Sequence, residues 1–229
     1  MTMQSKSYQL YVFDWDGTVM DTTGLIARGM QQACVTLGYP QPDLDACRET
    51  IGLPFAESFA RVAPGFRYEQ LDDFLTAYRN WYLQREAQVD VMAGLEDLFD
   101  RMTKNGLRFA VATGKSRAGL IRVFERTGLE KYFEATVTAD ESFPKPNPAM
   151  LEKLSDETGV DVREMVMIGD SIHDLQLAQN ARCDAVAVTW GAARLPELQS
   201  YPAVAYVSDV KELIRALSLS YLYEESQSA

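Results

Sequence analysis

Histidine and cysteine are scarce in this chain of 229 residues, which contains one His and three Cys. The cysteines, Cys34, Cys47 and Cys183, are odd in number, widely spaced and without a CxxC pair. Structural zinc sites and disulfide frameworks need clustered or paired cysteines, so we expect reduced, buried side chains at these positions. A lone loop histidine is more often exposed than catalytic, so we assign no role to His173 and predict no Ser-His-Asp triad.

Positive charge is also in short supply. Lys and Arg number 22 against 33 Asp and Glu, which gives a formal net charge of −11. Nucleic-acid backbones and anionic membranes are bound by basic patches, so neither is an expected partner. No apolar run is long enough to cross a bilayer, and residues 1–7 lack the apolar core of a signal peptide. We therefore expect a cytoplasmic protein, and any phosphate substrate would need a cation in its site.

The chain does contain a regular alternation of strand-like and helix-like segments. Hydrophobic residues make up 47% of it, as is typical of a folded protein. Apolar runs that predict buried strands occupy Tyr8 to Phe13, Leu107 to Ala112, Met165 to Ile168 and Asp184 to Val188. Helical patterns cover Gly94 to Lys104, Ser116 to Thr127, Pro148 to Thr158 and Asp174 to Ala181. This alternation predicts an α/β fold, a Rossmann-like parallel sheet with helices on both faces, whose ligands bind at the carboxyl ends of the strands.

Residues 20–90 interrupt the alternation and contain no strand pattern. Helical patterns occupy Thr22 to Leu37, Leu44 to Ile51, Phe55 to Val62 and Glu69 to Arg85, with Gly and Pro turn signals between them. We interpret this segment as an inserted α-helical domain, with residues 1–19 and 91–229 forming the sheet domain. The polar tail after Ser218 is predicted to be loose.

The strongest chemical motif follows the first strand and reads Asp14-Trp15-Asp16-Gly17-Thr18. Carboxylates at i and i+2 point to the same side of an extended chain. They repel each other, so the pair is costly unless a cation or a shared proton relieves it. The motif therefore indicates a metal-assisted nucleophile beside an acid/base, with an acidic helix-capping turn as the weaker alternative.

Thr113, Gly114 and Lys115 follow the second strand and precede a helix. Backbone amides at a helix N-terminus can bind an anion together with the Thr113 hydroxyl. The Gly-Lys-Ser stretch is similar to part of a P-loop, but that motif requires glycine at position 109, where this chain has Phe. Thr113 and Gly114 are thus candidate phosphate-binding residues, although a strand-to-helix turn with Thr is common without any ligand.

Lys145 lies between Pro144 and Pro146, in a stretch that continues to Asn147 and Pro148. The prolines restrict the backbone, so a stiff loop would present the ammonium as a point charge. Taken alone, such a stretch is more often a turn with an exposed lysine before a helix.

A second acidic motif, Gly169-Asp170-Ser171-Ile172-His173-Asp174, follows another apolar strand. Carboxylates on loops at a sheet edge suit Mg²⁺, which binds few carboxylates and keeps several waters. Asp170 is therefore a candidate metal ligand. Asp174 either supports the site without binding the metal or caps the following helix.

The four motifs, in this order, resemble motifs one to four of the haloacid dehalogenase-like hydrolase superfamily. The resemblance spans the sheet domain, and the helical insert is similar to the small α-helical cap of the phosphoglycolate phosphatase-like branch. It implies a Mg²⁺-dependent phosphatase that hydrolyses a small phosphorylated metabolite, phosphoglycolate-like or a sugar phosphate, through an aspartyl-phosphate intermediate.

The resemblance also implies a role for each motif residue. Asp14 would be the nucleophile, and Asp16 would protonate the leaving group and then activate water. The phosphoryl group would be bound by Thr113, Gly114 and Lys145. Mg²⁺ would be bound by Asp14, the backbone carbonyl of Asp16, and Asp170.

Two other activities of the superfamily are disfavoured. Halide displacement needs neither a proton for the leaving group nor a metal, so Asp16 and Asp170 argue against a dehalogenase. Phosphonate cleavage uses a cap lysine, and residues 21–90 contain no lysine. The chain departs from the family pattern at Arg182, where a glycine usually ends the helix after motif four, so the local geometry there is open.

Other interpretations stay open. A β-phosphoglucomutase-like phosphosugar mutase would share the motifs and differ in excluding water from the phosphoenzyme. A phospho-accepting signalling module is remote because such modules are shorter and lack the insert, and a non-catalytic binding protein is disfavoured by the intact carboxylates. The sequence leaves open the oligomeric state and the cap residues that select the substrate, with Arg28, Arg48 and the Gly52-Leu53-Pro54 turn as candidates.

Overall fold

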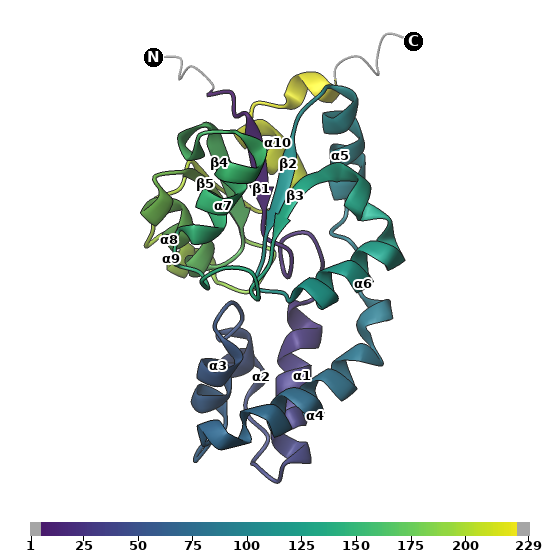
Figure 1. The fold of residues 1–229 in the computed structure, drawn as a ribbon, viewed down its shortest axis with the longest axis vertical. Coiled ribbons are helices and arrows are strands. Elements are labelled where there is room, and N and C mark those ends of the chain that lie inside the picture. Colours follow the sequence, from purple (N-terminus) through teal and green to yellow (C-terminus); the bar gives the residue numbers. More distant parts are fainter. Residues whose placement is uncertain (1–5, 224–229) are drawn as a thin grey trace.

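The computed structural model describes residues 6–223, which form one parallel sheet with helices on both faces and a separate group of helices below it (Figure 1). In this part of the chain the strand order is β3-β2-β1-β4-β5-β6, and every pairing is parallel. The strands are β1 (Leu10–Phe13), β2 (Phe109–Ala112), β3 (Phe133–Val137), β4 (Met165–Gly169), β5 (Asp184–Val188) and β6 (Ala205–Val207). The predicted Rossmann-like α/β fold is confirmed.

The four strands predicted from apolar runs occupy the middle of the sheet, and the two edge strands were missed. β3 is only partly buried and carries Glu134, and β6 has three residues. An edge strand has one hydrogen-bonded neighbour and needs less apolar side-chain surface than a central strand. These two segments therefore lack the continuous apolar run that identifies the others.

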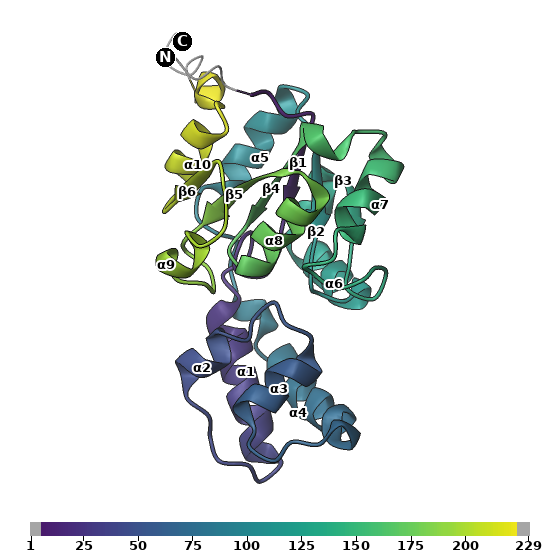
Figure 2. The same cartoon turned by 90° about the vertical axis from the view of Figure 1, so that its left-hand side faces the viewer.

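In the described residues, six helices cover the sheet. They are α5 (Leu95–Lys104), α6 (Arg117–Thr127), α7 (Ala149–Thr158), α8 (Ile172–Ala181), α9 (Leu195–Leu198) and α10 (Val210–Ala216). Alternate residues of β1 enter two different hydrophobic clusters, Tyr11 and Phe13 with α5, α6 and α10, and Leu10 and Val12 with α7 and α8. Figure 2 shows these two helical layers on opposite sides of the strands. Burial on both faces explains why the central strands are apolar throughout.

The helical segment between β1 and α5, which we call the cap, lies against the carboxyl ends of the strands (Figures 1 and 2). It contains α1 (Thr23–Thr36), α2 (Leu44–Arg48), α3 (Phe55–Val62) and α4 (Leu71–Leu83). These helices share their own hydrophobic cluster, with Phe59 and Phe74 fully buried at its centre and the free cysteines Cys34 and Cys47 within it. The cap thus has a core separate from the two layers around the sheet.

The two connections between cap and sheet domain lie side by side. The amide of Asp21 donates to the carbonyl of Asp90 at 3.1 Å, and the amide of Met92 donates to the carbonyl of Val19 at 2.8 Å. These bonds form a two-stranded hinge. The domain boundaries at 19/20 and 90/91 remain a prediction.

Short 3₁₀ turns complete the described chain. They are η1 (Tyr68–Gln70), η2 (Glu86–Gln88), η3 (Leu129–Tyr132), η4 (Val162–Glu164) and η5 (Ser220–Tyr223).

The prediction of a loose tail after Ser218 is wrong as far as Tyr223, because Leu219 and Leu222 are buried in the sheet-domain core. Residues 224–229 lie outside the described residues. Within residues 6–223, no helix combines the length and the apolar character needed to span a membrane.

Arg182 takes over the position usually held by glycine at the end of α8. Its φ is 58°, in the left-handed region, and the amide of Cys183 donates to the carbonyl of Ala178 at 2.8 Å. The helix therefore ends with the hydrogen bond expected of a glycine-terminated helix. A residue with a Cβ pays about 1–2 kcal/mol for this conformation.

Candidate active site

Three of the predicted site residues come directly after neighbouring strands. Asp14 follows β1, Thr113 follows β2 and Asp170 follows β4, and these strands are adjacent and in register. The amide of Asp14 donates to the carbonyl of Ile168 at 2.9 Å, which extends the pairing of β1 with β4 to Asp14. The sheet therefore brings residues about 150 positions apart to one edge, beneath the cap.

Lys145 reaches this edge from its proline-rich loop. Its Nζ lies 2.8 Å from Oδ1 of Asp14 and 2.6 Å from Oδ1 of Asp174, and the lysine side chain is 5% exposed. Burial opposes the charge, but the two carboxylates outweigh it and raise the pKa of Lys145 above its ordinary value. The lysine is thus a buried cation between two acids, and the exposed-lysine alternative is wrong.

Asp174 is fully buried and held on both of its oxygens. Oδ1 accepts from Lys145, and Oδ2 accepts from the amide of Ser171 at 3.0 Å and from its hydroxyl at 2.7 Å. Helix α8 begins at Ile172 with Ser171 as its N-cap, so Asp174 closes a capping box from the third helical position. The alternative that Asp174 is itself the N-cap is wrong.

Asp170 is oriented by two hydrogen bonds. Oδ1 accepts from the hydroxyl of Thr18 at 2.8 Å, and Oδ2 accepts from the amide of Ala192 at 2.6 Å. Glycines crowd the same carboxylate, since a Cβ on Gly17 would lie 2.3 Å from Oδ2 and a Cβ on Gly191 would lie 2.1 Å from it. Gly191 was not singled out from the sequence. The sequence signal that could have identified Gly191 is its position just after the predicted strand at Asp184 to Val188.

The carboxylates of Asp14, Asp170 and Asp174 form a buried cluster in which one oxygen of each lies within 4.8 Å of the others. Lys145 supplies one positive charge to three acids. Burial, followed by repulsion from Asp174, raises the pKa of Asp170 to about 7, and burial raises the pKa of Asp14 well above its ordinary value.

A divalent cation fits this deficit of positive charge, and carboxylate oxygens are the ligands that Mg²⁺ prefers. Both oxygens of Asp174 are already engaged with Lys145 and Ser171. Asp170 is also hydrogen-bonded on both oxygens, by Thr18 and Ala192, so these contacts alone do not separate the candidate ligands. The assignment of Asp14 and Asp170 as metal ligands remains a prediction.

Asp16 lies apart from this cluster and faces Lys115. Oδ1 of Asp16 is 3.0 Å from Nζ of Lys115, with the side chains 16% and 10% exposed. The buried hydroxyl of Thr113 accepts from the amide of Lys115 at 3.0 Å, whereas a Cβ on Gly114 would meet open space. Lys115 had no expected role, and no local pattern of residues indicates its pairing with Asp16.

The cap reaches the sheet domain at His173. A Cβ on Gly52 would lie 3.0 Å from Cδ2 of this histidine, and burial lowers the pKa of the imidazole. Its Nδ1 is buried and has no hydrogen-bond partner within residues 6–223. His173 is therefore half-buried and stays without an assigned role, and the Gly52-Leu53-Pro54 turn does meet motif four.

A cavity of about 770 Å³ lies at this junction, between the start of α3, the proline-rich loop and α8. Leu53, Arg61, Lys145 and His173 are among its lining residues. Arg28 is exposed on α1, and Arg48 pairs with Asp45 on the cap surface at 3.4 Å. Neither of these arginines lines the cavity, so the turn is the cap candidate that the structure places beside the site.

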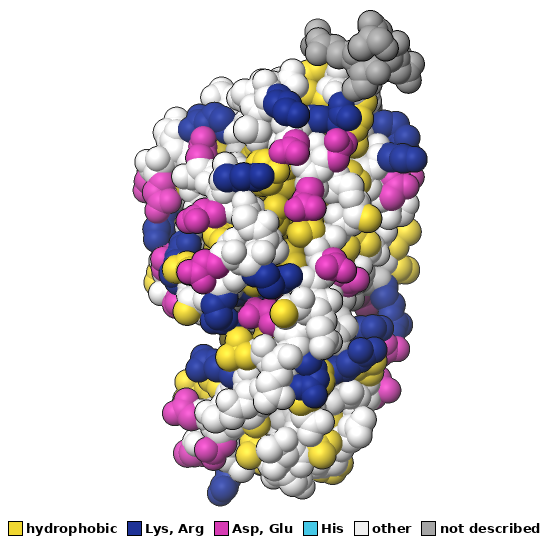
Figure 3. Space-filling view, turned by 90° about the vertical axis from the view of Figure 1, so that its right-hand side faces the viewer, with side chains coloured by type: hydrophobic (Ala, Val, Ile, Leu, Met, Phe, Trp, Pro, Cys, Tyr) yellow, Lys and Arg dark blue, Asp and Glu magenta, His cyan; other side chains and the backbone are white. Residues whose placement is uncertain are grey.

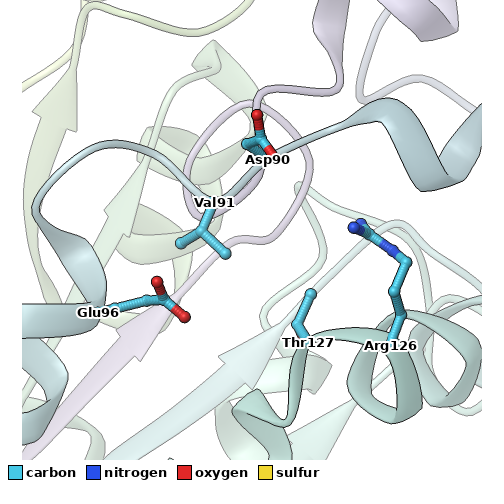
Figure 4. A pocket seen from close by; sticks show the side chains of 5 residues that line it. All are labelled: Asp90, Val91, Glu96, Arg126 and Thr127. Atoms are coloured by element: carbon cyan, nitrogen blue, oxygen red, sulfur yellow. The ribbon is translucent and has the colours of Figure 1, made fainter.

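A smaller hollow of about 380 Å³ lies next to the hinge (Figure 4). It is lined by Asp90, Val91, Glu96, Arg126 and Thr127. None of the predicted site residues lines it.

The chain belongs to the haloacid dehalogenase-like hydrolase family, whose model matches residues 11–188. It is 31% identical to the probable phosphatase IndB of Dickeya dadantii over 90% of this chain and 92% of that protein. It is 27% identical to phosphoglycolate phosphatase of Agrobacterium fabrum, over 91% of each chain. These findings confirm the predicted enzyme class, a phosphoric monoester hydrolase.

The fold is shared with solved structures of the same family. A haloacid dehalogenase-like family hydrolase from Streptococcus pneumoniae superposes with a TM-score of 0.82 over 93% of this chain and 99% of that chain, at 19% identity. The similarity covers the cap as well as the sheet domain, because it includes nearly the whole of both chains.

Proposed function

We propose that this enzyme hydrolyses a small phosphorylated metabolite with the help of Mg²⁺, through an aspartyl phosphate on Asp14. The observation that carries the proposal is the buried cluster of Asp14, Asp170 and Asp174 around Lys145 at the carboxyl edge of the sheet. The relatives named as a phosphatase and as phosphoglycolate phosphatase support a phosphate monoester as substrate.

Asp14 and Asp170, with the backbone carbonyl of Asp16, would hold the metal. Bound Mg²⁺ would neutralise charge on the phosphoryl oxygens, which a carboxylate nucleophile cannot approach unassisted. Lys145, 2.8 Å from Asp14, counteracts the burial that raises the pKa of Asp14, orients its carboxylate and offers further N–H donors to a phosphoryl oxygen. The Thr113 hydroxyl and the amides that follow it would bind the remaining phosphoryl oxygens.

In the first step an oxygen of Asp14 bonds to phosphorus, the bond to the leaving oxygen breaks, and Asp16 gives that oxygen a proton. In the second step water attacks the phosphorus and Asp16 takes a proton from it. Inorganic phosphate leaves and the Asp14 carboxylate is regenerated. Such acid/base assistance contributes about 10²–10⁴-fold to a rate.

The cap restricts what can reach Asp14. It covers the sheet edge, and the Gly52 turn packs against His173 of motif four. Closing a site excludes water and leaves room for a small substrate. We accordingly keep the expectations of a small-metabolite partner, no nucleic-acid or membrane partner, and a cytoplasmic location.

The test separates the two carboxylates by role. Asp14→Asn should abolish phosphoryl transfer, because an amide is too poor a nucleophile. Asp16→Asn should still form the aspartyl phosphate from p-nitrophenyl phosphate, whose leaving group needs little protonation, but should hydrolyse it slowly. Intact-protein mass after an acid quench measures the adduct. A phosphate adduct on Asp14→Asn, or wild-type turnover by Asp16→Asn, would reverse the assignment.

The mutase alternative is tested with the same preparations. A phosphosugar mutase would convert a hexose 1-phosphate into the 6-phosphate without releasing phosphate. We expect release of inorganic phosphate with no isomer, as measured by ³¹P NMR. Isomer formation faster than phosphate release would favour the mutase.

A further inference from the structure

Lys115 is buried beside the proposed acid/base, and the proposed reaction gives it no role. The side chain of Lys115 is 10% exposed. An ammonium has three N–H donors. Within the described residues, the carboxylate of Asp16 is the one acidic group paired with it, at 3.0 Å. Donors of the lysine therefore remain for another acceptor.

Cap residues close over this lysine from helix α4. The ring centroid of Tyr82 lies 5.4 Å from Nζ of Lys115, and the ring stacks on Tyr78 with 5.5 Å between centroids. The hydroxyl of Tyr82 is buried and has no hydrogen-bond partner in the part of the chain that the structure describes. A buried hydroxyl without a partner is costly unless a ligand supplies one.

The neighbouring acid does not need Lys115 as a counter-ion. Glu86, at the end of the cap, is buried, and its Oε2 lies 3.3 Å from Nε of Arg122 on α6. Its Oε1 has no hydrogen-bond partner among residues 6–223. The charge of Glu86 is therefore matched in part by an arginine across the domain junction, and Glu86 adds to the negative charge that Asp16 places around Lys115.

We propose that Lys115 and Tyr82 form a subsite for an anionic group carried by the leaving group of the substrate, either a carboxylate or a second phosphate. This inference rests on the proposed function, because Asp16 marks the side on which the leaving oxygen departs. A group bonded next to that oxygen lies beside Lys115. Its oxygens accept hydrogen bonds from the ammonium of Lys115 in the sheet domain and from the hydroxyl of Tyr82 in the cap.

The surface around the junction suits an anionic substrate. Figure 3 shows Lys and Arg side chains gathered at the level where the sheet domain meets the cap. The chain as a whole has a net charge of −11, so basic side chains at the junction run against the composition. It would raise the concentration of anions at the junction.

The experiment compares substrates that differ in the charge of the leaving group. Phosphate release is measured from 2-phosphoglycolate, from pyrophosphate and from 2-hydroxyethyl phosphate, which has a neutral leaving group of similar size. The proteins are the wild type, Lys115→Met, Lys115→Arg, Tyr82→Phe and, as matched control, Lys104→Met, which alters an exposed lysine on α5.

We expect Lys115→Met to lower kcat/KM about 10–100-fold for the anionic leaving group that the wild type prefers, as for loss of a charged hydrogen bond. The same variant should lower kcat/KM for 2-hydroxyethyl phosphate several-fold less. Lys115→Arg should retain part of the preference, Tyr82→Phe should weaken it, and Lys104→Met should keep it. The proposal allows a carboxylate or a second phosphate in the subsite. The anionic substrate whose kcat/KM falls most in Lys115→Met identifies which of the two groups binds there.

Equal losses on charged and neutral leaving groups would overturn the subsite and leave Lys115 acting only on Asp16. A wild type that prefers the neutral substrate would also overturn it. Tyr82→Phe keeps the proposal testable should Lys115→Met fail to fold, and an unchanged preference in that variant would count against the subsite. Absence of phosphate release from every compound would instead remove the proposed function, and this inference with it.

Discussion

Magnesium should stabilise the folded protein more at pH 8 than at pH 6. The pKa of Asp170 is raised from 3.8 to about 7 by burial and by Asp174. Because this folded-state pKa lies above the unfolded one, the metal-free protein binds the extra proton between these values and loses stability as the pH rises through them. Bound metal requires the ionised carboxylate, so protons compete with Mg²⁺ below pH 7.

The size of the effect follows from the same pKa. At pH 6 roughly nine-tenths of the Asp170 carboxyls are protonated in the metal-free protein, so the apparent affinity is about tenfold below that at pH 8. If the dissociation constant at pH 8 is on the order of 0.1 mM, about 10 mM Mg²⁺ stabilises by about 2.7 kcal/mol at pH 8 and about 1.4 kcal/mol at pH 6. For a chain of this length these energies raise the Tm by roughly 5–10 °C at pH 8 and by about half as much at pH 6.

Thermal unfolding with and without Mg²⁺, at both pH values, measures this difference. Asp170→Asn removes the titrating group and a proposed ligand together, so its Mg²⁺-induced shift should be small and independent of pH. Asp161→Asn changes an exposed carboxylate paired with Arg163, and should keep the wild-type pattern. Equal shifts at pH 6 and pH 8 in the wild type, or a wild-type shift in Asp170→Asn, would refute the reasoning.

Three further outcomes are expected. Gly191→Ala should weaken Mg²⁺ binding about 10–100-fold in calorimetric titration, because the new Cβ would lie 2.1 Å from Oδ2 of Asp170. Gly24→Ala is the control, since a Cβ there meets open space. Equal Mg²⁺ affinities of the two variants would contradict the packing argument. Arg182→Gly should raise the free energy of unfolding in urea by about 1 kcal/mol, since glycine adopts a positive φ without strain; a loss of stability would mean that the arginine side chain makes compensating contacts. A folded phosphoprotein should release no phosphate under conditions in which a small phosphomonoester is turned over, and efficient release would show that the cap does not restrict access.

The central strands and the position of the motifs could be predicted because their causes are local. A strand buried on both faces must be apolar along its length, and β1, β2 and β4 satisfy this condition, as does β5 after its first residue, Asp184. Parallel strands bring their carboxyl ends to one edge, so residues that follow them are neighbours whatever their separation in sequence. The placement of Asp14, Thr113 and Asp170 follows from this rule alone.

Contacts between side chains from different loops depended on the tertiary structure. The sequence shows that Lys145 is held by prolines, but only the packed loop gives it Asp14 and Asp174 as partners. The bond from the amide of Ala192 to Asp170 likewise joins two segments whose local patterns carry no sign of each other. The edge strands β3 and β6 belong to the same category, because pairing with a neighbour, more than their own composition, holds them in the sheet.

The sequence by itself determined the fold class, the family and the acids at the edge of the sheet, since each depends on periodicity or on short motifs. The tertiary structure alone decided that Lys115 faces Asp16, that Tyr82 of the cap lies over Lys115, and that His173 meets the Gly52 turn. The first contact joins two loops of the sheet domain, and the other two join the cap to the sheet domain. The geometry of these two is set by how separately packed cores dock, and no local pattern of residues encodes that docking.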